Sequence, residues 1–243
     1  MGKTAQLHFY NWTNPSSKVS VASSRLSSFR LGNLFRFPAF SKHLPILLRT
    51  CLSMGLDDHI ERVLWTEQEI SDRVSQLASQ ISEDFKGCQS PPVMVGVATG
   101  AFLFLADVVR QIKLPVAVDF VRVESYGSGT ESSGAPLISC DVKIDIGGKH
   151  VILVEDIIDT GHTLSCLISH LESKGACSIS VCTFLDKPSR RKVHFKLVGE
   201  GRLYRGFECP DYFVVGYGMD FAELYRNLPY VGVLKPELYK LAS

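Results

Sequence analysis

The stretch VILVEDIIDTGHTL occupies residues 151–164 and is the most informative part of the sequence about the fold. Its first four residues are apolar, which is typical of a strand buried in the centre of a parallel sheet. Carboxylates follow at Glu155, Asp156 and Asp159, and residues 160–163 then have the composition of a tight turn that opens a helix. Ligands of open α/β sheets bind at the carboxyl ends of the strands. The stretch therefore predicts a strand, a turn and a helix with a ligand site where the strand ends.

Apolar runs alternate with helical patterns on both sides of this stretch. A capping box of Thr66 and Glu69 opens a helix with apolar residues at helical spacing. Further strands are predicted at 92–98, 115–123, 149–156 and 178–187, and helices follow Gly100 and run from 162 to Gly175. The polar, Ser- and Gly-rich segment 124–141 is predicted to be a functional loop or a disordered one. This alternation predicts an α/β fold, with a parallel-stranded central sheet flanked by helices and a small C-terminal addition after residue 188.

Composition excludes several classes of protein. The chain has 243 residues, 45% of them hydrophobic, enough for one domain with an appendage. Residues 1–53 contain seven Lys or Arg and no Asp or Glu, so the remainder carries a net charge of −6. An acidic body argues against a nucleic-acid partner. No apolar run approaches the ~20 residues of a membrane span, and the seven cysteines lack metal-ligand spacing.

The first 53 residues form a separate N-terminal extension in this interpretation. Their acid-free, Ser- and Arg-rich composition resembles an organellar transit peptide, although a translated leader would have the same composition. We expect residues 1–53 to be disordered and residues 54–243 to form the domain. The predicted location is the cytoplasm, or a plastid or mitochondrion if the extension is a working transit peptide.

The polar groups after the strand indicate a particular ligand. Amides and hydroxyls of residues 160–163, at the start of a helix, suit a phosphate monoester. Glu155 and Asp156 cannot help to bind that phosphate, but carboxylates accept hydrogen bonds from sugar hydroxyls and bind Mg²⁺. A phosphorylated ribose that carries pyrophosphate would satisfy all of these groups. The alternative is a capped helix with an exposed acidic turn, in which Asp159 is the N-cap.

Residues 154–163 resemble the phosphoribosyl-pyrophosphate motif of type I phosphoribosyltransferases, most closely that of the hypoxanthine(-guanine) branch. The resemblance extends over about residues 59–239. GVATGAFLFLADVVR (96–110) is similar to the pyrophosphate-binding loop of the family, SYGSGTESSG (125–134) to its mobile catalytic loop, and DYFVVGYGMDFAELYRNLPYVGVL (211–234) to its purine-covering hood. The chain departs at Thr99, where relatives often have Lys, Arg or Asn. The resemblance therefore implies a backbone contact to pyrophosphate there, made in the family through a non-proline cis peptide.

The resemblance also implies a role for each site residue and places the purine-covering hood mainly in about residues 188–243. Asp159 would relay a proton near the purine N7, while Ser125 and Tyr126 would close over the reaction centre and exclude water. Pyrophosphate would contact Thr99, Gly100 and Arg226, and Mg²⁺ would bind Asp220 and Glu155. Lys187 would donate to the purine 6-oxo group, Phe213 would stack on the base, and Val214 would offer its backbone. The residues implied for ribose and 5-phosphate binding are Glu155, Asp156, Asp159, Thr160, Gly161, His162 and Thr163.

The implied activity is Mg²⁺-dependent transfer of 5-phosphoribosyl from 5-phosphoribosyl 1-diphosphate to hypoxanthine or guanine, which gives IMP or GMP and pyrophosphate. One alternative is a sibling enzyme that prefers xanthine or another base. Another is a non-catalytic regulator that keeps the fold as a ligand sensor and binds nucleic acid. The acidic body and the presence of Ser125, Tyr126, Lys187 and Asp220 favour the enzyme. The family further implies a homodimer or homotetramer without nucleic-acid or membrane partners.

Overall fold

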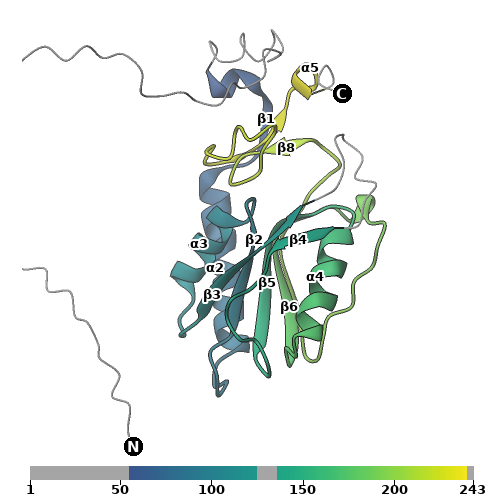
Figure 1. Cartoon of the computed structure of the whole chain (residues 1–243). Coiled ribbons are helices and arrows are strands. Elements are labelled where there is room, and N and C mark those ends of the chain that lie inside the picture. The colour runs from purple at the N-terminus through teal and green to yellow at the C-terminus, as the bar shows by residue number, and fades with distance from the viewer. Residues whose placement is uncertain (1–54, 125–135, 240–243) are drawn as a thin grey trace, which may run out of the picture. The chain divides into compact units, whose positions relative to one another are not determined.

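A six-stranded sheet forms the centre of the structure, a computed structural model that describes residues 55–124 and 136–239 (Figure 1). The strand order is β4-β3-β2-β5-β6-β7. All neighbours pair in parallel except β4, which runs antiparallel to β3. The predicted parallel-stranded sheet is therefore confirmed. Its strands are β2 (Val93–Ala98), β3 (Ala117–Glu124), β4 (Leu137–Cys140), β5 (His150–Ile158), β6 (Ser178–Asp186) and β7 (Leu203–Glu208).

Helices cover both faces of this sheet. The helices α2 (Glu67–Asp84) and α3 (Phe102–Gln111) lie on one face, and α4 (His162–Ser173) lies on the other (Figure 1). The predicted capping box opens α2, because the Thr66 amide donates to Glu69 Oε2 at 2.8 Å and the Thr66 hydroxyl accepts from the Glu69 amide. The helix after residue 160 ends near Gly175, as expected, and Gly175 has φ +84°.

Strand β5 supplies apolar side chains to two cores. Ile152 and Val154 pack in the core with α2 and α3, whereas Val151 and Leu153 pack in the core with α4. Adjacent residues of a strand point to opposite faces, so a strand covered on both faces needs an unbroken apolar run. Strand β5 contains Glu155 and Asp156, as predicted, and extends to Ile158, two residues beyond the predicted end.

A second sheet of three antiparallel strands, together with residues 211–213 and 216–230, forms the part that we call the hood. Its order is β1-β9-β8, from β1 (Ile60–Trp65), β8 (Val214–Val215) and β9 (Val231–Leu234). The hood therefore takes a strand from before α2 as well as from the C-terminal segment. Conversely β7, which falls within the C-terminal segment, is an edge strand of the central sheet. The short helices are η1 (Leu56–His59), η2 (Pro188–Arg190) and α5 (Pro236–Tyr239).

The end of the polar segment 124–141 forms strand β4 rather than a loop. Residues 1–53 and the rest of that segment, 125–135, lie outside the described residues. Within the described ranges, no helix is both long and apolar enough to cross a membrane.

Candidate active site

The candidate site lies where the strand order of the central sheet reverses direction. From β2 the chain moves to β3 on one side, and from β5 it moves to β6 on the other, so β2 and β5 are neighbours at the switch point. Crevices at the carboxyl ends of such neighbouring strands are the usual ligand sites of open α/β sheets. The turn at Thr99 and Gly100 follows β2, and the turn at Asp159–Gly161 follows β5. The topology thus brings two of the predicted ligand-binding segments together.

The turn after β5 ends in a helix N-terminus without a side-chain cap. Gly161 is the N-cap of α4 with φ +88°, and no side chain caps the helix there. A Cβ at Gly161 would overlap the Val193 carbonyl oxygen, so this position requires glycine for space as well as for φ. Because Gly161 is the N-cap, Asp159 does not cap the helix, and its carboxylate forms an ion pair with Arg190. The first-turn amides of α4 are left without a capping side chain and can bind an anion.

Glu155 and Asp156 form a carboxyl pair, in which Glu155 is buried and Asp156 is half-buried. Glu155 is 7% exposed and its Oε2 has no hydrogen-bond partner among the described residues. Burial, reinforced by the neighbouring Asp156 carboxylate, raises the pKa of Glu155 well above its ordinary value. Burial also raises the pKa of Asp156, while hydrogen bonds from Glu155 and the Ile157 amide partly oppose the rise. The acids do not form the exposed turn that the alternative required, and they are arranged to receive a polar or cationic ligand.

This pair predicts how stability depends on pH. Because the pKa of Glu155 is higher in the folded chain, its stabilising effect is complete below the ordinary value of 4.5 and is lost as pH rises through the raised pKa. Glu155→Gln keeps a neutral polar side chain at all pH values. In the ligand-free, metal-free protein we therefore expect Glu155→Gln to raise Tm more at pH 8 than at pH 5. Thermal unfolding at several pH values checks this, with the exposed Glu83→Gln as control; equal shifts at both pH values would contradict it.

The turn after β2 packs tightly against two parts of the site. The Ala98–Thr99 peptide is cis, which confirms the geometry that the family resemblance implied. A Cβ at Gly100 would overlap the Asp156 carboxylate, and a Cβ at Gly218 would overlap the Gly100 carbonyl oxygen. Gly100 therefore lies between Asp156 and the hood. The absence of a Cβ lets the backbone of this turn approach both, and a bound ligand could use the same closeness.

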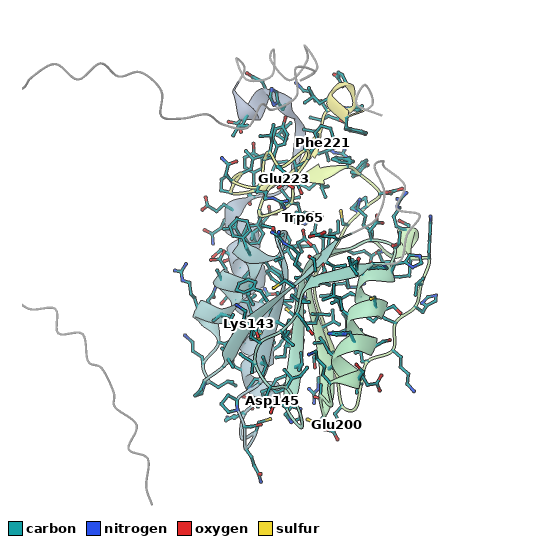
Figure 2. All side chains as sticks on the ribbon, viewed as in Figure 1. Trp65, Lys143, Asp145, Glu200, Phe221 and Glu223 are labelled. Atoms are coloured by element: carbon teal, nitrogen blue, oxygen red, sulfur yellow. The ribbon has the colours of Figure 1, made fainter. Side chains whose placement is uncertain are left out.

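Asp220 and Arg226, assigned to metal and pyrophosphate respectively, are partners in the hood. Asp220 Oδ1 lies 2.9 Å from Arg226 Nη2, and Arg226 Nη1 donates to the Gly218 carbonyl at 2.8 Å. Glu223, which Figure 2 labels at the hood end of the molecule together with Phe221, accepts from Arg226 at 3.0 Å. Burial raises the pKa of Asp156, and the charge of Arg226 opposes a small part of that rise. The structure thus places this hood pair beside the turn at Gly100.

Lys187 joins the end of β6 to the hood. Its amide donates to the Ile158 carbonyl at 2.9 Å, which fixes the residue beside the end of β5. Its Nζ donates to the Tyr212 carbonyl at 2.7 Å and lies 4.0 Å from Asp211 Oδ1. The Lys187 side chain is 10% exposed, so it is not the solvated surface lysine that a single Lys in a sequence usually indicates. The ammonium is thereby held next to the segment that contains Phe213 and Val214.

Phe213 presents an aromatic surface at the edge of the hood. It is 36% exposed, stacks on Tyr239 at a centroid distance of 4.6 Å, and meets Phe221 edge to face at 5.6 Å. Its carbonyl accepts from the Leu234 amide at 2.9 Å. Val214 is buried in β8 and pairs with Val233 of β9. Phe213 is fixed on the Tyr239 side and partly open to solvent, as a stacking partner for a base would be.

Arg190 is a residue of the site that the sequence did not indicate. Arg190 lies 3.1 Å from Asp159 and 3.7 Å from Asp211, so it links the turn after β5 to the hood. The stretch LDKPSRR contained this residue, but nothing in the sequence distinguished it from its neighbour Arg191, which pairs with Asp186. Ser125 and Tyr126 lie outside the described residues.

The described part of the chain contains no group of three or more His, Cys, Asp or Glu residues that could hold a metal ion alone. A magnesium ion need not have such a cage, because Mg²⁺ usually binds one or two carboxylates together with substrate phosphates and water. Glu155 and Asp220 are carboxylates of the type that such an ion would use.

Comparison with known proteins agrees with this geometry. The family model named phosphoribosyl transferase domain matches residues 64–222, which is more than half of the chain. The chain belongs to the phosphoribosyltransferase family. The matched region includes both turns at the switch point, β6 with Lys187, and the hood residues Phe213 and Asp220. The six-stranded sheet with its flanking helices is the fold of the type I phosphoribosyltransferases.

Individual relatives of this phosphoribosyltransferase are similar over most of their own length. The hypoxanthine-guanine phosphoribosyltransferase of Bacillus subtilis is 44% identical over 181 residues, which cover 74% of this chain and 97% of the relative. A crystal structure of a hypoxanthine phosphoribosyltransferase from Staphylococcus aureus has a TM-score of 0.69 and 41% identity, and the match covers 76% of this chain and 96% of that one. A hypoxanthine-guanine phosphoribosyltransferase from Bacillus anthracis has a TM-score of 0.66 and 43% identity, with 72% and 99% covered.

Proposed function

We propose that this phosphoribosyltransferase is a purine salvage enzyme. It transfers 5-phosphoribosyl from 5-phosphoribosyl 1-diphosphate to hypoxanthine or guanine and gives IMP or GMP and pyrophosphate. The observation that best supports the proposal is the burial of Lys187, whose ammonium lies 2.7 Å from the Tyr212 carbonyl beside Phe213. This arrangement gives a 6-oxopurine a stacking surface and a hydrogen-bond donor. The named activities of the relatives from Bacillus and Staphylococcus support the same base class.

The phosphoribosyl donor, 5-phosphoribosyl 1-diphosphate, binds along the two turns at the switch point. Its 5-phosphate accepts hydrogen bonds from the uncapped start of α4, at Thr160, Gly161, His162 and Thr163. Its ribose hydroxyls donate to Glu155 and Asp156, with Asp159 at the end of the same set. Its pyrophosphate contacts the backbone of Thr99 and Gly100 and the guanidinium of Arg226. A bound donor therefore gives partners to groups that otherwise lack them, including Glu155 Oε2.

Magnesium is proposed as the cofactor of the reaction. Asp220 and Glu155 would hold it, and the unpartnered Oε2 of Glu155 fits a cation ligand. When bound, the ion neutralises charge that develops on the pyrophosphate leaving group. Arg226 pairs with Asp220, and its guanidinium would bind pyrophosphate beside the carboxylate that would hold the ion.

Asp159 is proposed as the general base. It receives the proton from the purine N7 region as the bond forms between N9 of the base and C1′ of the ribose. Lys187 holds the 6-oxo group, and Phe213 and Val214 hold the ring and its edge. Ser125 and Tyr126 are proposed to cover the reaction centre and to exclude water from the ribosyl group.

Nucleotide formation with hypoxanthine, guanine, xanthine and adenine tests this proposal. We expect the full-length protein with Mg²⁺ and 5-phosphoribosyl 1-diphosphate to convert hypoxanthine and guanine to IMP and GMP. Preference for xanthine would instead select the sibling enzyme, and the absence of nucleotide with any base would favour a ligand-binding regulator. Chromatographic quantification of each nucleotide and of pyrophosphate distinguishes these outcomes.

The domain boundary is proposed to lie at residue 54. Every residue assigned to the site follows it, so a chain that begins at Met54 should keep the kcat/KM of the full chain. Loss of folding or activity in the shorter protein would show that residues 1–53 belong to the domain. Fusion of residues 1–53 to a fluorescent reporter separately tests the cytoplasmic location against a plastid or mitochondrial one.

We also propose that the enzyme assembles as a homodimer or homotetramer. Light scattering of the purified protein measures its mass directly. A mass equal to that of one chain at assay concentrations would contradict the proposal.

A further inference from the structure

We infer that Arg122 binds the pyrophosphate group of the donor, an inference that rests on the proposed function. Arg122 lies at the carboxyl end of β3, and Arg122 is in register with Ala98 of β2. Its Nη2 donates to Thr99 Oγ1 at 3.1 Å. The guanidinium is therefore held against the turn that we assign to pyrophosphate. Thr99 itself carries no charge, and Arg122 supplies one at the same place.

The charges around the site single out this arginine. Arg226 pairs with Asp220 and Glu223, Arg190 pairs with Asp159, and Lys187 lies near Asp211. By contrast, no carboxylate lies within 4 Å of Arg122 in the parts of the chain that the structure describes. Thr99 accepts from one N–H of the guanidinium, which has five. Arg122 thus adds positive charge that the acids of the site do not already neutralise.

Arg122 also has room to meet a ligand. The residue is exposed and lines a pocket of about 360 Å³ between the ends of β2, β3 and β4. Glu124 lines the same pocket without an ion pair to Arg122. Arginine binds phosphate oxygens in a bidentate fashion, with charge-assisted hydrogen bonds that are stronger than neutral ones. The guanidinium can therefore turn from the Thr99 hydroxyl to the pyrophosphate oxygens, or bind both.

Two substitutions separate the charge of Arg122 from its hydrogen bond. Arg122→Gln keeps a donor for Thr99 but removes the charge, whereas Arg122→Lys keeps the charge. We expect Arg122→Gln to raise KM for 5-phosphoribosyl 1-diphosphate about tenfold and to weaken binding of inorganic pyrophosphate in calorimetry by a similar factor. KM for hypoxanthine should change little. Arg122→Lys should restore most of the loss, and so should Thr99→Lys added to Arg122→Gln, since it returns a cation to the same turn.

Arg110→Gln on α3 is the matched control, because Arg110 is exposed, pairs with Asp107 at 3.5 Å and has no assigned role in the site. Unchanged donor KM and unchanged pyrophosphate affinity in Arg122→Gln would overturn the inference. So would an effect of equal size in Arg110→Gln, which would indicate a general charge effect. If the wild-type protein formed no nucleotide, the proposed function would fail instead, and the pyrophosphate titration would still decide whether Arg122 binds that anion.

Discussion

Adenine is expected to be a substrate at least ~10⁴-fold poorer than hypoxanthine for this enzyme, as measured by kcat/KM. Adenine carries an amino donor where hypoxanthine and guanine carry an acceptor oxygen. The ammonium of Lys187 has three donors and no acceptor, and the Tyr212 carbonyl already takes one of them. An adenine in this pocket would set donor against donor in a position that is 10% exposed. The buried polar groups would then lack partners, which is the situation in which enzymes discriminate most strongly.

Substitution of Lys187 tests whether this residue causes the discrimination. Lys187→Ala should lose much of the kcat/KM for hypoxanthine and guanine, so the ratio of this kcat/KM to that for adenine should decrease. The Gln side chain in Lys187→Gln can both donate and accept a hydrogen bond, so this variant should decrease the ratio further. Because both changes remove the ammonium that donates to the Tyr212 carbonyl, thermal unfolding of each variant is needed to show that the protein remains folded. Full 6-oxopurine activity with intact discrimination in Lys187→Ala would reduce Lys187 to a structural lysine.

The second large effect is expected for Asp159. Asp159→Asn keeps the size of the side chain but removes the basic carboxylate, so kcat should fall by at least ~10²-fold while KM for the ribosyl donor changes little. Stability should change little, because the Asp159–Arg190 ion pair is partly exposed on both sides.

Arg190→Gln provides the comparison for this experiment. It removes the same ion pair and leaves the carboxylate in place, so it should keep far more activity than Asp159→Asn. Near-normal kcat in Asp159→Asn, or an equal loss in both variants, would argue against proton relay by Asp159.

The centre of the sheet could be predicted because β2, β5 and β6 are covered on both faces. Such strands need mainly apolar sequences, and these stood out at 92–98, 151–154 and 178–187. The hood was harder to predict. Its strands are short, and β1 lies about 150 residues before β8, so no local pattern links them. Strand β7 was also missed, because LYRGFE is a partly exposed edge strand without an apolar run.

The candidate site, like the fold, could be predicted only in part. Residues 155–163 are contiguous, so their chemistry could be interpreted directly from the sequence. Their detailed roles could not, since the burial of Glu155 and the absence of a cap on α4 depend on packing around them. Lys187 and Phe213 came to attention through family resemblance alone. The partners Arg122 and Arg190 depend on contacts between separate segments, which no spacing in the sequence reveals.

A crystal structure of the enzyme with IMP would test the proposed site in one experiment, because the product carries the phosphate, ribose and base together. We expect the 5′-phosphate at residues 160–163, the ribose hydroxyls at Glu155 and Asp156, and the 6-oxo group within hydrogen-bond distance of Lys187 Nζ. We also expect the base to stack on Phe213. A nucleotide bound elsewhere, or bound here with its base directed away from Lys187 and Phe213, would show that the proposed site is wrong.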